Sequence, residues 1–191
     1  REAACSYLGN VMSRGTSTMN HQQIQDALDK LGASLSVSSG LGTLSVSIQV
    51  KQENLAATLD IAKQILQDPV FPKEEFDVLI QQRMASLEAA STDPQQLAVN
   101  LVTRKLFPYD NDDVRAQHTY EQQMKELKEL QLSDVKAIYD EFLDNSNGEL
   151  IVVGDFESEA VKQAIDESIG DLGSTQKYSR IPRQAFLDIP G

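Results

Sequence analysis

The sequence of 191 residues has a single cysteine, Cys5, and no tryptophan. One cysteine excludes an internal disulfide framework, but it leaves the cellular compartment open because many secreted and periplasmic proteins carry no disulfide. We interpret Cys5 as a small buried apolar side chain. Long apolar runs are also missing, since none approaches the roughly 20 residues that a membrane-spanning helix needs. The sequence therefore predicts no insertion into a membrane.

Basic residues are scarce, because 17 lysines and arginines stand against 29 aspartates and glutamates, for a net charge of -12. Attraction to phosphate requires a basic face, so this balance argues against binding to nucleic acid or to an anionic membrane surface. Hydrophobic residues make up 40% of the chain, which is enough for a substantial core. We expect that core to belong to one domain.

Apolar residues near the start of the chain follow helical spacing and then strand spacing. Residues 2–13 place apolar side chains at helical intervals. Residues 20–32 predict a second helix, with Asn20 as its N-cap and Gly32 as its terminator. Residues 34–50 alternate between apolar and polar side chains on both sides of a glycine turn. This alternation predicts a β-hairpin with one buried face.

The rest of the chain is mostly helical by pattern. Pro72 is expected in the first turn of one helix, and Ser133 is expected to cap another. Residues 150–153 form a short apolar run that predicts a strand. The expected helices are residues 53–67, 73–90, 94–106, 120–130, 133–142 and 157–170.

Seven or eight expected helices against three or four strands favour the α+β class, with an antiparallel sheet covered on one side by helices. The hairpin and residues 150–153 are the strands with the clearest pattern. We expect further strands from residues upstream of this sequence, because a hairpin alone makes an incomplete sheet. The expected division is one domain over residues 1–175, followed by an extended segment or linker over residues 176–191.

The residues alone show no catalytic constellation. His21 and His118 lack partners at metal-ligand spacing, so we interpret both as surface histidines. The glycines on either side of Leu41 join two predicted strands, whereas a phosphate-binding loop follows a strand and opens a helix. The acidic pairs at 74–75 and 112–113 lack the ligand spacing of a calcium loop.

Three longer motifs follow one another in a fixed order: GTSTMNHQQIQDALDKLGASLSVSSGLGTLSVSIQV, LQDPVFPKEEFDVLIQQRMASLEAASTDP and LQLSDVKAIYDEFLDNSNGELIVVGDFESEAVKQAI. Together they resemble the pitrilysin/insulinase family of zinc metallopeptidases, over residues 8–172. The resemblance implies an α+β unit like one unit of the mitochondrial processing peptidase/insulinase fold.

In active members of that family, the residues before the Gly-Thr pair are His-x-x-Glu-His, whose histidines bind zinc while the glutamate activates the bound water. A later glutamate completes the site. The resemblance places Ser6 and Asn10 at the histidine positions, Gly9 at the catalytic glutamate and Gln82 at the later ligand. Because a hydroxyl, amides and a glycine do not replace imidazole and carboxylate, the resemblance implies no bound zinc and no hydrolysis by this chain.

The resemblance therefore implies a non-catalytic half of a zinc metallopeptidase, which forms part of the substrate chamber and supports an active half. That active half carries the zinc, in the same polypeptide or in a partner subunit, and the substrate is a peptide or an unfolded protein. The alternative is a structural or assembly subunit of the same fold with no role in proteolysis. The compartment stays open, with the bacterial periplasm or cell envelope as one expectation.

Overall fold

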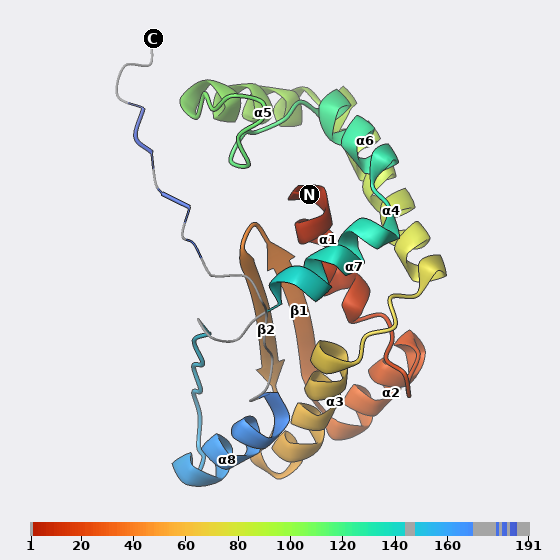
Figure 1. Ribbon diagram of the computed structural model, residues 1–191, viewed down its shortest axis with the longest axis vertical. Coiled ribbons are helices and arrows are strands. Elements are labelled where there is room, and N and C mark those ends of the chain that lie inside the picture. The colour runs from red at the N-terminus through yellow and green to blue at the C-terminus, as the bar shows by residue number, and fades with distance from the viewer. Residues whose placement is uncertain (1, 144–147, 170–178, 180, 183, 187–191) are drawn as a thin grey trace.

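The computed structural model describes residues 2–143, 148–169, 179, 181–182 and 184–186. Within these residues, a two-stranded antiparallel sheet packs with a set of helices (Figure 1), which confirms the α+β class. The elements are α1 (Glu2–Met12), α2 (His21–Leu31), β1 (Ser34–Gly40), β2 (Thr43–Gln49), a 3-10 helix (Gln52–Asn54), α3 (Leu55–Gln67), α4 (Lys73–Thr92), α5 (Pro94–Leu106), α6 (Tyr120–Glu129), α7 (Leu132–Phe142) and α8 (Ser158–Ile169).

The hairpin has one apolar face and one serine-rich face, as its alternating sequence predicts. In the observed register, Leu35 pairs with Ile48 and Val37 pairs with Val46. Their side chains lie on one face of the pleated sheet, because side chains alternate along a strand. The opposite face carries the paired serines of the two strands, which are exposed. In the described part of the chain, the apolar face of the hairpin packs into the hydrophobic core with α1, as expected.

Helix α1 lies at the centre of the hydrophobic core, between β1 and α7 (Figure 1). Its residues Ala4, Leu8, Val11 and Met12 are buried, at the helical spacing seen in the sequence. Buried side chains of α2, α3 and α7 complete the core around it. Cys5 is half-buried at the edge of this core, so it is less buried than predicted.

The helix ends agree with the sequence in part. Asn20 caps α2 through its side chain, which accepts from the backbone N–H of Gln23, and Gly32 ends the helix in the left-handed conformation with φ 57°. Two predictions were wrong by a turn or less. Pro72 is the N-cap of α4 and not part of its first turn, and α7 begins before Ser133 because Gln131 occupies the capping position.

The strand predicted at residues 150–153 is absent. This segment has no β-partner, and its four apolar side chains are 39 to 91% exposed. An extended segment becomes a strand only when a neighbouring strand supplies hydrogen bonds, and the described residues offer none beside it. As a result, β1 and β2 form the only sheet in the described ranges, where three or four strands were expected.

The C-terminal part of the chain begins with α8, which packs on α3, where the Lys63 Nζ donates to the Glu167 carbonyl over 3.1 Å. Much of the segment predicted at 176–191 lies outside the described residues. Those that are described form no strand, and the predicted domain boundary at residue 175 stays a prediction. No helix in the described ranges is long and apolar enough to cross a membrane.

Candidate functional site

The positions singled out in the sequence lie on two helices that contact each other, α1 and α4. Ser6 and Asn10 are four residues apart on α1, and both are exposed. This spacing puts them on one face of the helix. Gln82 is exposed on α4. Gly9 is different from the other three, because it is buried.

Gly9 faces the backbone of strand β1. A Cβ atom on Gly9 would lie 2.9 Å from the carbonyl carbon of Ser38 and 3.0 Å from both the Ser38 Cα and the Ser39 nitrogen. The Gly9 N–H also donates to the Ser39 Oγ over 2.8 Å. No side chain fits at this position unless the strand moves. Sequence reasoning treated Gly9 only as a missing base, whereas the structure shows that this glycine lets α1 approach the sheet.

Two further side chains lie near the α1–α4 contact and were missed from the sequence. Tyr7 follows Ser6, and burial raises the pKa of its hydroxyl above the ordinary value, while the positive charge of Arg83 acts in the opposite direction. Arg83 follows Gln82 on α4. A phenol and a guanidinium can therefore take part in polar contacts here, but neither is a usual zinc ligand.

The donor set at the four positions does not fit zinc. Zinc in proteins is bound by thiolate, imidazole and carboxylate groups, and Ser6, Gly9, Asn10 and Gln82 offer none of these. Elsewhere in the part of the chain that the structure describes, no group of three or more His, Cys, Asp or Glu side chains is placed to hold a metal ion.

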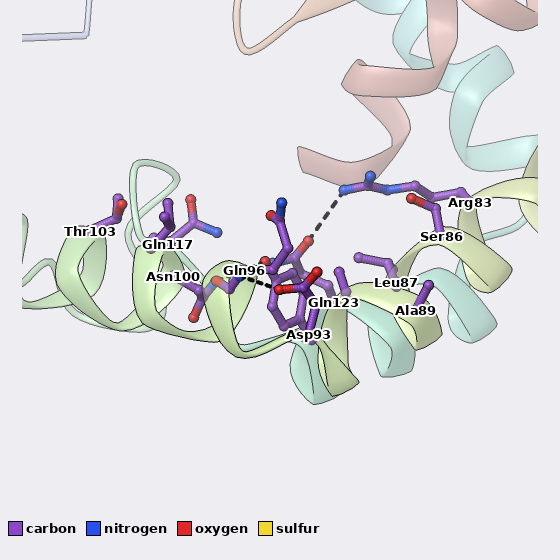
Figure 2. A pocket seen from close by; sticks show the side chains of 13 residues that line it. Arg83, Ser86, Leu87, Ala89, Asp93, Gln96, Asn100, Thr103, Gln117 and Gln123 are labelled. Carbon is purple, nitrogen blue, oxygen red and sulfur yellow. Dashed lines mark hydrogen bonds between the residues drawn. The ribbon is translucent and has the colours of Figure 1, made fainter.

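A pocket of about 530 Å³ with a mixed polar and apolar lining opens between α4, α5 and α6. Figure 2 shows Arg83 and Ser86 of α4 at one end and Thr103 of α5 with Gln117 at the other. Between them, Gln96 and Asn100 lie one helical turn apart on α5, a spacing that was visible in the sequence. The volume is within the range of ligand pockets, but such pockets are usually more apolar.

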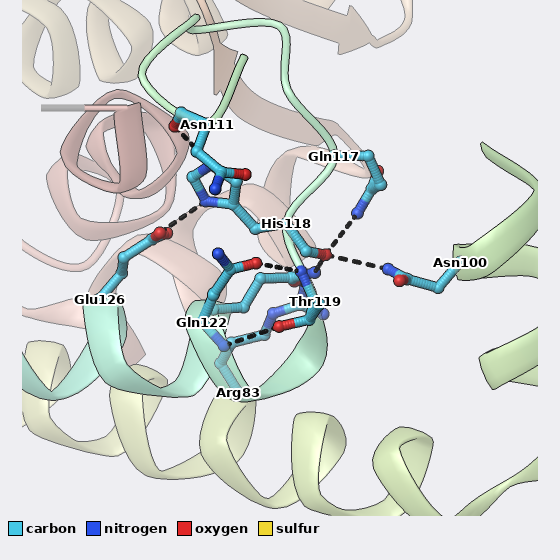
Figure 3. Close-up of polar contacts among 9 residues, drawn as sticks. Arg83, Asn100, Asn111, Gln117, His118, Thr119, Gln122 and Glu126 are labelled. Atoms are coloured by element: carbon cyan, nitrogen blue, oxygen red, sulfur yellow. Dashed lines mark hydrogen bonds and ion pairs between the residues drawn. The ribbon is translucent and has the colours of Figure 1, made fainter. Parts of the chain in front are cut away.

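The wall of this pocket is held by the backbone of His118 (Figure 3). Its carbonyl accepts hydrogen bonds from the side-chain amides of Asn100, Gln117 and Gln123, over 3.0, 3.4 and 2.9 Å respectively. Arg83 in turn donates to the Gln123 Oε1 over 3.4 Å. The side-chain amides of Asn100, Gln117 and Gln123, which line the pocket, therefore already donate hydrogen bonds within the protein.

The His118 side chain is only 16% exposed, so its interpretation as a surface histidine was wrong. Its Nδ1 lies 2.5 Å from the Glu126 carboxylate, and its Nε2 lies 3.1 Å from the Asn111 carbonyl (Figure 3). These contacts fix the loop after α5 against α6. The role that the structure supports for His118 is therefore structural.

His21 is the first residue of α2 and is partly exposed. Its Nδ1 lies 3.4 Å from the Arg14 Nη1 and 4.0 Å from the Glu75 Oε2, and Arg14 also contacts Glu75 at 3.4 Å. The cluster joins the end of α1 to the starts of α2 and α4. It contains one imidazole and one carboxylate, which is too few for a zinc site.

Most of the sequence from α1 to α6 matches a known family. The family model for insulinase, peptidase family M16, matches residues 5–128. The chain belongs to the insulinase family of peptidases. This confirms the resemblance seen in the three sequence motifs. No curated protein matches the sequence.

Solved structures of an M16 domain and of other proteases share the fold at low identity. The inactive domain of an M16 peptidase from Pseudomonas fluorescens has a TM-score of 0.79 and 15% identity, over 95% of this chain and 44% of that chain. A protease from Helicobacter pylori has a TM-score of 0.71 and 15% identity, over 95% and 43%. The ferredoxin protease FusC, in complex with Arabidopsis ferredoxin, has a TM-score of 0.64 and 13% identity, over 95% and 19%. This chain thus spans less than half the length of these relatives.

Proposed function

We propose that this chain is the non-catalytic half of a zinc metallopeptidase, which forms part of the substrate chamber and supports an active half. The observation that carries the proposal is the contact between Gly9 and Ser38. The position that the family resemblance assigns to the catalytic glutamate is filled by the backbone of β1. Because no glutamate fits at this position unless β1 moves, the chain supplies no general base. Its contribution to proteolysis is then made through its surfaces.

The family assignment supports the same proposal. Solved structures that share this fold include an M16 domain described as inactive, and that domain and the Helicobacter pylori protease are each more than twice as long as this chain. The active half, in the same polypeptide or in a partner subunit, supplies the zinc. One relative of the same fold is a ferredoxin protease caught with ferredoxin, which favours a peptide or protein substrate for the complete enzyme.

An assembly subunit without a role in proteolysis is the second candidate. It is favoured by the exposed apolar side chains of α5, which suit a permanent contact with another subunit. The two functions differ in one respect that can be measured. A chamber wall is needed for hydrolysis, whereas an assembly subunit is not.

The experiment compares peptidase activity of the active half alone with activity of the same half when this chain is supplied in cis or in trans. We expect the active half alone to keep its zinc, because its ligands lie within it, and to lose most of its peptide hydrolysis. Zinc is measured by elemental analysis on the same samples. Full hydrolysis by the active half alone contradicts the chamber role and favours the assembly function.

A further inference from the structure

The ring of His118 lies between helix α6 and the loop that precedes it, and both ring nitrogens make contacts (Figure 3). The Nδ1 lies 2.5 Å from a carboxylate oxygen of Glu126 on α6. The Nε2 lies 3.1 Å from the carbonyl oxygen of Asn111 in the loop. The ring therefore connects the middle of the loop to the helix.

Both partners of the ring are hydrogen-bond acceptors. A carboxylate and a carbonyl offer lone pairs and no proton, so each contact needs an N–H group on the ring. A neutral imidazole carries one N–H group, whereas an imidazolium carries two. Only the charged ring of His118 can therefore donate to Glu126 and to Asn111 at the same time.

The contact with Asn111 is the one that a neutral ring gives up. Hydrogen bonds to a carboxylate are roughly twice as strong as those between neutral groups, so the remaining proton is expected on Nδ1, facing Glu126. The Nε2 then directs a lone pair at the Asn111 carbonyl. Because the His118 side chain is only 16% exposed, little water is available to replace the lost partner.

The other charged groups around the ring make contacts elsewhere. Among the described residues, Glu126 of α6 is the charged group in contact with the ring. Arg83 of α4 donates to a side-chain amide of α6. Asp113 and Arg115 of the loop pair with each other, and α5 contributes an uncharged amide, which reaches the His118 carbonyl. The charge of the ring is therefore balanced by Glu126.

The end of the loop next to α6 is held without the ring. Thr119 caps the helix, because its N–H donates to the Gln122 Oε1 over 2.9 Å and its Oγ1 accepts from the Gln122 N–H over 3.2 Å. The His118 carbonyl accepts from Asn100 and Gln123. The peptide group between residues 118 and 119 is thus fixed on both sides, so loss of the Asn111 contact frees the residues before it and leaves α6 in place.

Residues 107–117 have little else to hold them against the helices. Each of them is exposed or half-buried. A segment with few buried contacts opens at a low cost in free energy. Gln117 belongs to this segment and lines one end of the pocket between α4, α5 and α6 (Figure 2). A loop that moves therefore changes that end of the pocket.

We propose that His118 is a proton-dependent latch, which holds residues 107–117 against α6 while its ring is charged and releases them when the Nε2 proton is lost. Gln117 moves with the loop, so the pocket is closed at this end on the acid side of the ring's titration and open on the alkaline side. Histidine suits this use, because its ordinary change of charge falls between about pH 5 and 8. This regulation goes beyond the proposed function, which requires no change of pH.

A pH titration of the 191-residue chain by nuclear magnetic resonance tests the latch. The chain has two histidines, so His21→Gln assigns the ring signals of His118. The ring nitrogen shifts report its protons, and the backbone amide of Asp112 and the side-chain amide of Gln117 report the loop. We expect both amide signals to shift with the same midpoint as the ring, and the nuclear Overhauser contact between the ring and Asn111 to be lost in the neutral form.

The variant Glu126→Gln separates the latch from a general effect of pH. The new amide can accept a proton from a charged ring or donate one to the Nδ1 of a neutral ring, whose Nε2–H then still reaches Asn111. The contact between the ring and Asn111 should therefore persist on both sides of the titration, and the Gln117 signal should lose its pH response. His21→Gln is the matched control, because His21 also lies near a carboxylate, that of Glu75 at 4.0 Å, and it should leave the response intact.

Three outcomes would contradict the latch. In the first, the contact between the ring and Asn111 survives in the neutral form of the unchanged chain. In the second, the Asp112 and Gln117 signals shift with a midpoint that differs from that of the ring. In the third, Glu126→Gln keeps the pH response of the unchanged chain. None of these readouts uses hydrolysis, so they are independent of the activity comparison that tests the chamber role.

Discussion

Gly9 of α1 and Ser38 of β1 lie so close together that the glycine cannot be exchanged for another residue without moving the strand. The missing Cβ is the physical basis of the contact, since the added atom would lie 2.9 Å from the Ser38 carbonyl carbon. The helix can therefore rest directly on the hairpin. The position that the family resemblance assigns to the catalytic glutamate is therefore used for the packing of α1 on β1.

The first prediction concerns Gly9→Ala. In an ordinary helix interior, this change stabilises by about 0.5 to 1 kcal/mol, because alanine is the better helix former. Here we expect the opposite sign, with a loss of about 1 to 3 kcal/mol from overpacking against β1. The free energy of unfolding is measured by urea denaturation. Asn10→Ala, at an exposed position of the same helix, is the control. A stabilised Gly9→Ala variant would contradict the close contact.

The second prediction concerns rebuilding a zinc site. The unchanged chain should retain no stoichiometric zinc after dialysis, because its four positions offer no zinc ligands. The triple change Ser6→His, Asn10→His and Gln82→Glu supplies three ligands and should bind zinc weakly, since no second shell orients the histidines. Adding Gly9→Glu to the triple variant should lower its free energy of unfolding, because the new side chain does not fit against β1. It should not tighten the binding of zinc. Calorimetric titration with zinc compares the two variants, and an absence of binding in the triple variant would contradict the register at Gln82.

The third prediction concerns residues 150–153. Because Ile151 and Val153 are 75 and 91% exposed, the double change Ile151→Ser with Val153→Ser should alter the stability of this chain by less than about 0.5 kcal/mol. Val37→Ser, at a buried position of β1, should cost about 2 kcal/mol or more. Both are measured by thermal and urea denaturation. A large loss in the double variant would show that the segment is paired in solution.

The fourth prediction concerns pH. Hydrogen bonds from Arg115 lower the pKa of Asp113 from its ordinary 3.8 to about 2. A carboxyl group whose pKa is lower in the folded state stabilises that state fully above the unfolded pKa, and this contribution is lost as the pH falls through the folded pKa. The Asp113–Arg115 pair should therefore hold down to about pH 4 and weaken toward pH 2. The Arg115 Nε resonance reports the titration, and Asp113→Asn should abolish it. A midpoint near 3.8 would contradict the pairing.

The sequence by itself determined the local structure and the family. Period-two alternation fixed the hairpin and its buried face, and Asn20 and Gly32 fixed the ends of α2, because these effects act over a few neighbouring residues. The three ordered motifs predicted the family that the family model confirms. The same reasoning failed at residues 150–153, where an apolar extended run was taken for a strand. A strand depends on hydrogen bonds to a partner, and the described residues place none beside it.

Only the tertiary structure decided which polar and small residues have structural roles. In the sequence, Gly9 is one substituted position among four, and its contact with Ser38 depends on how closely a helix approaches a sheet. In the sequence nothing distinguishes His118 from a surface histidine, whereas in the fold its ring contacts Glu126 of the next helix. Arg115 has an acidic neighbour two residues away in the sequence, but its contact with Pro182 closes a long loop. Such contacts are set by packing between distant segments, which the periodicity of the sequence does not encode.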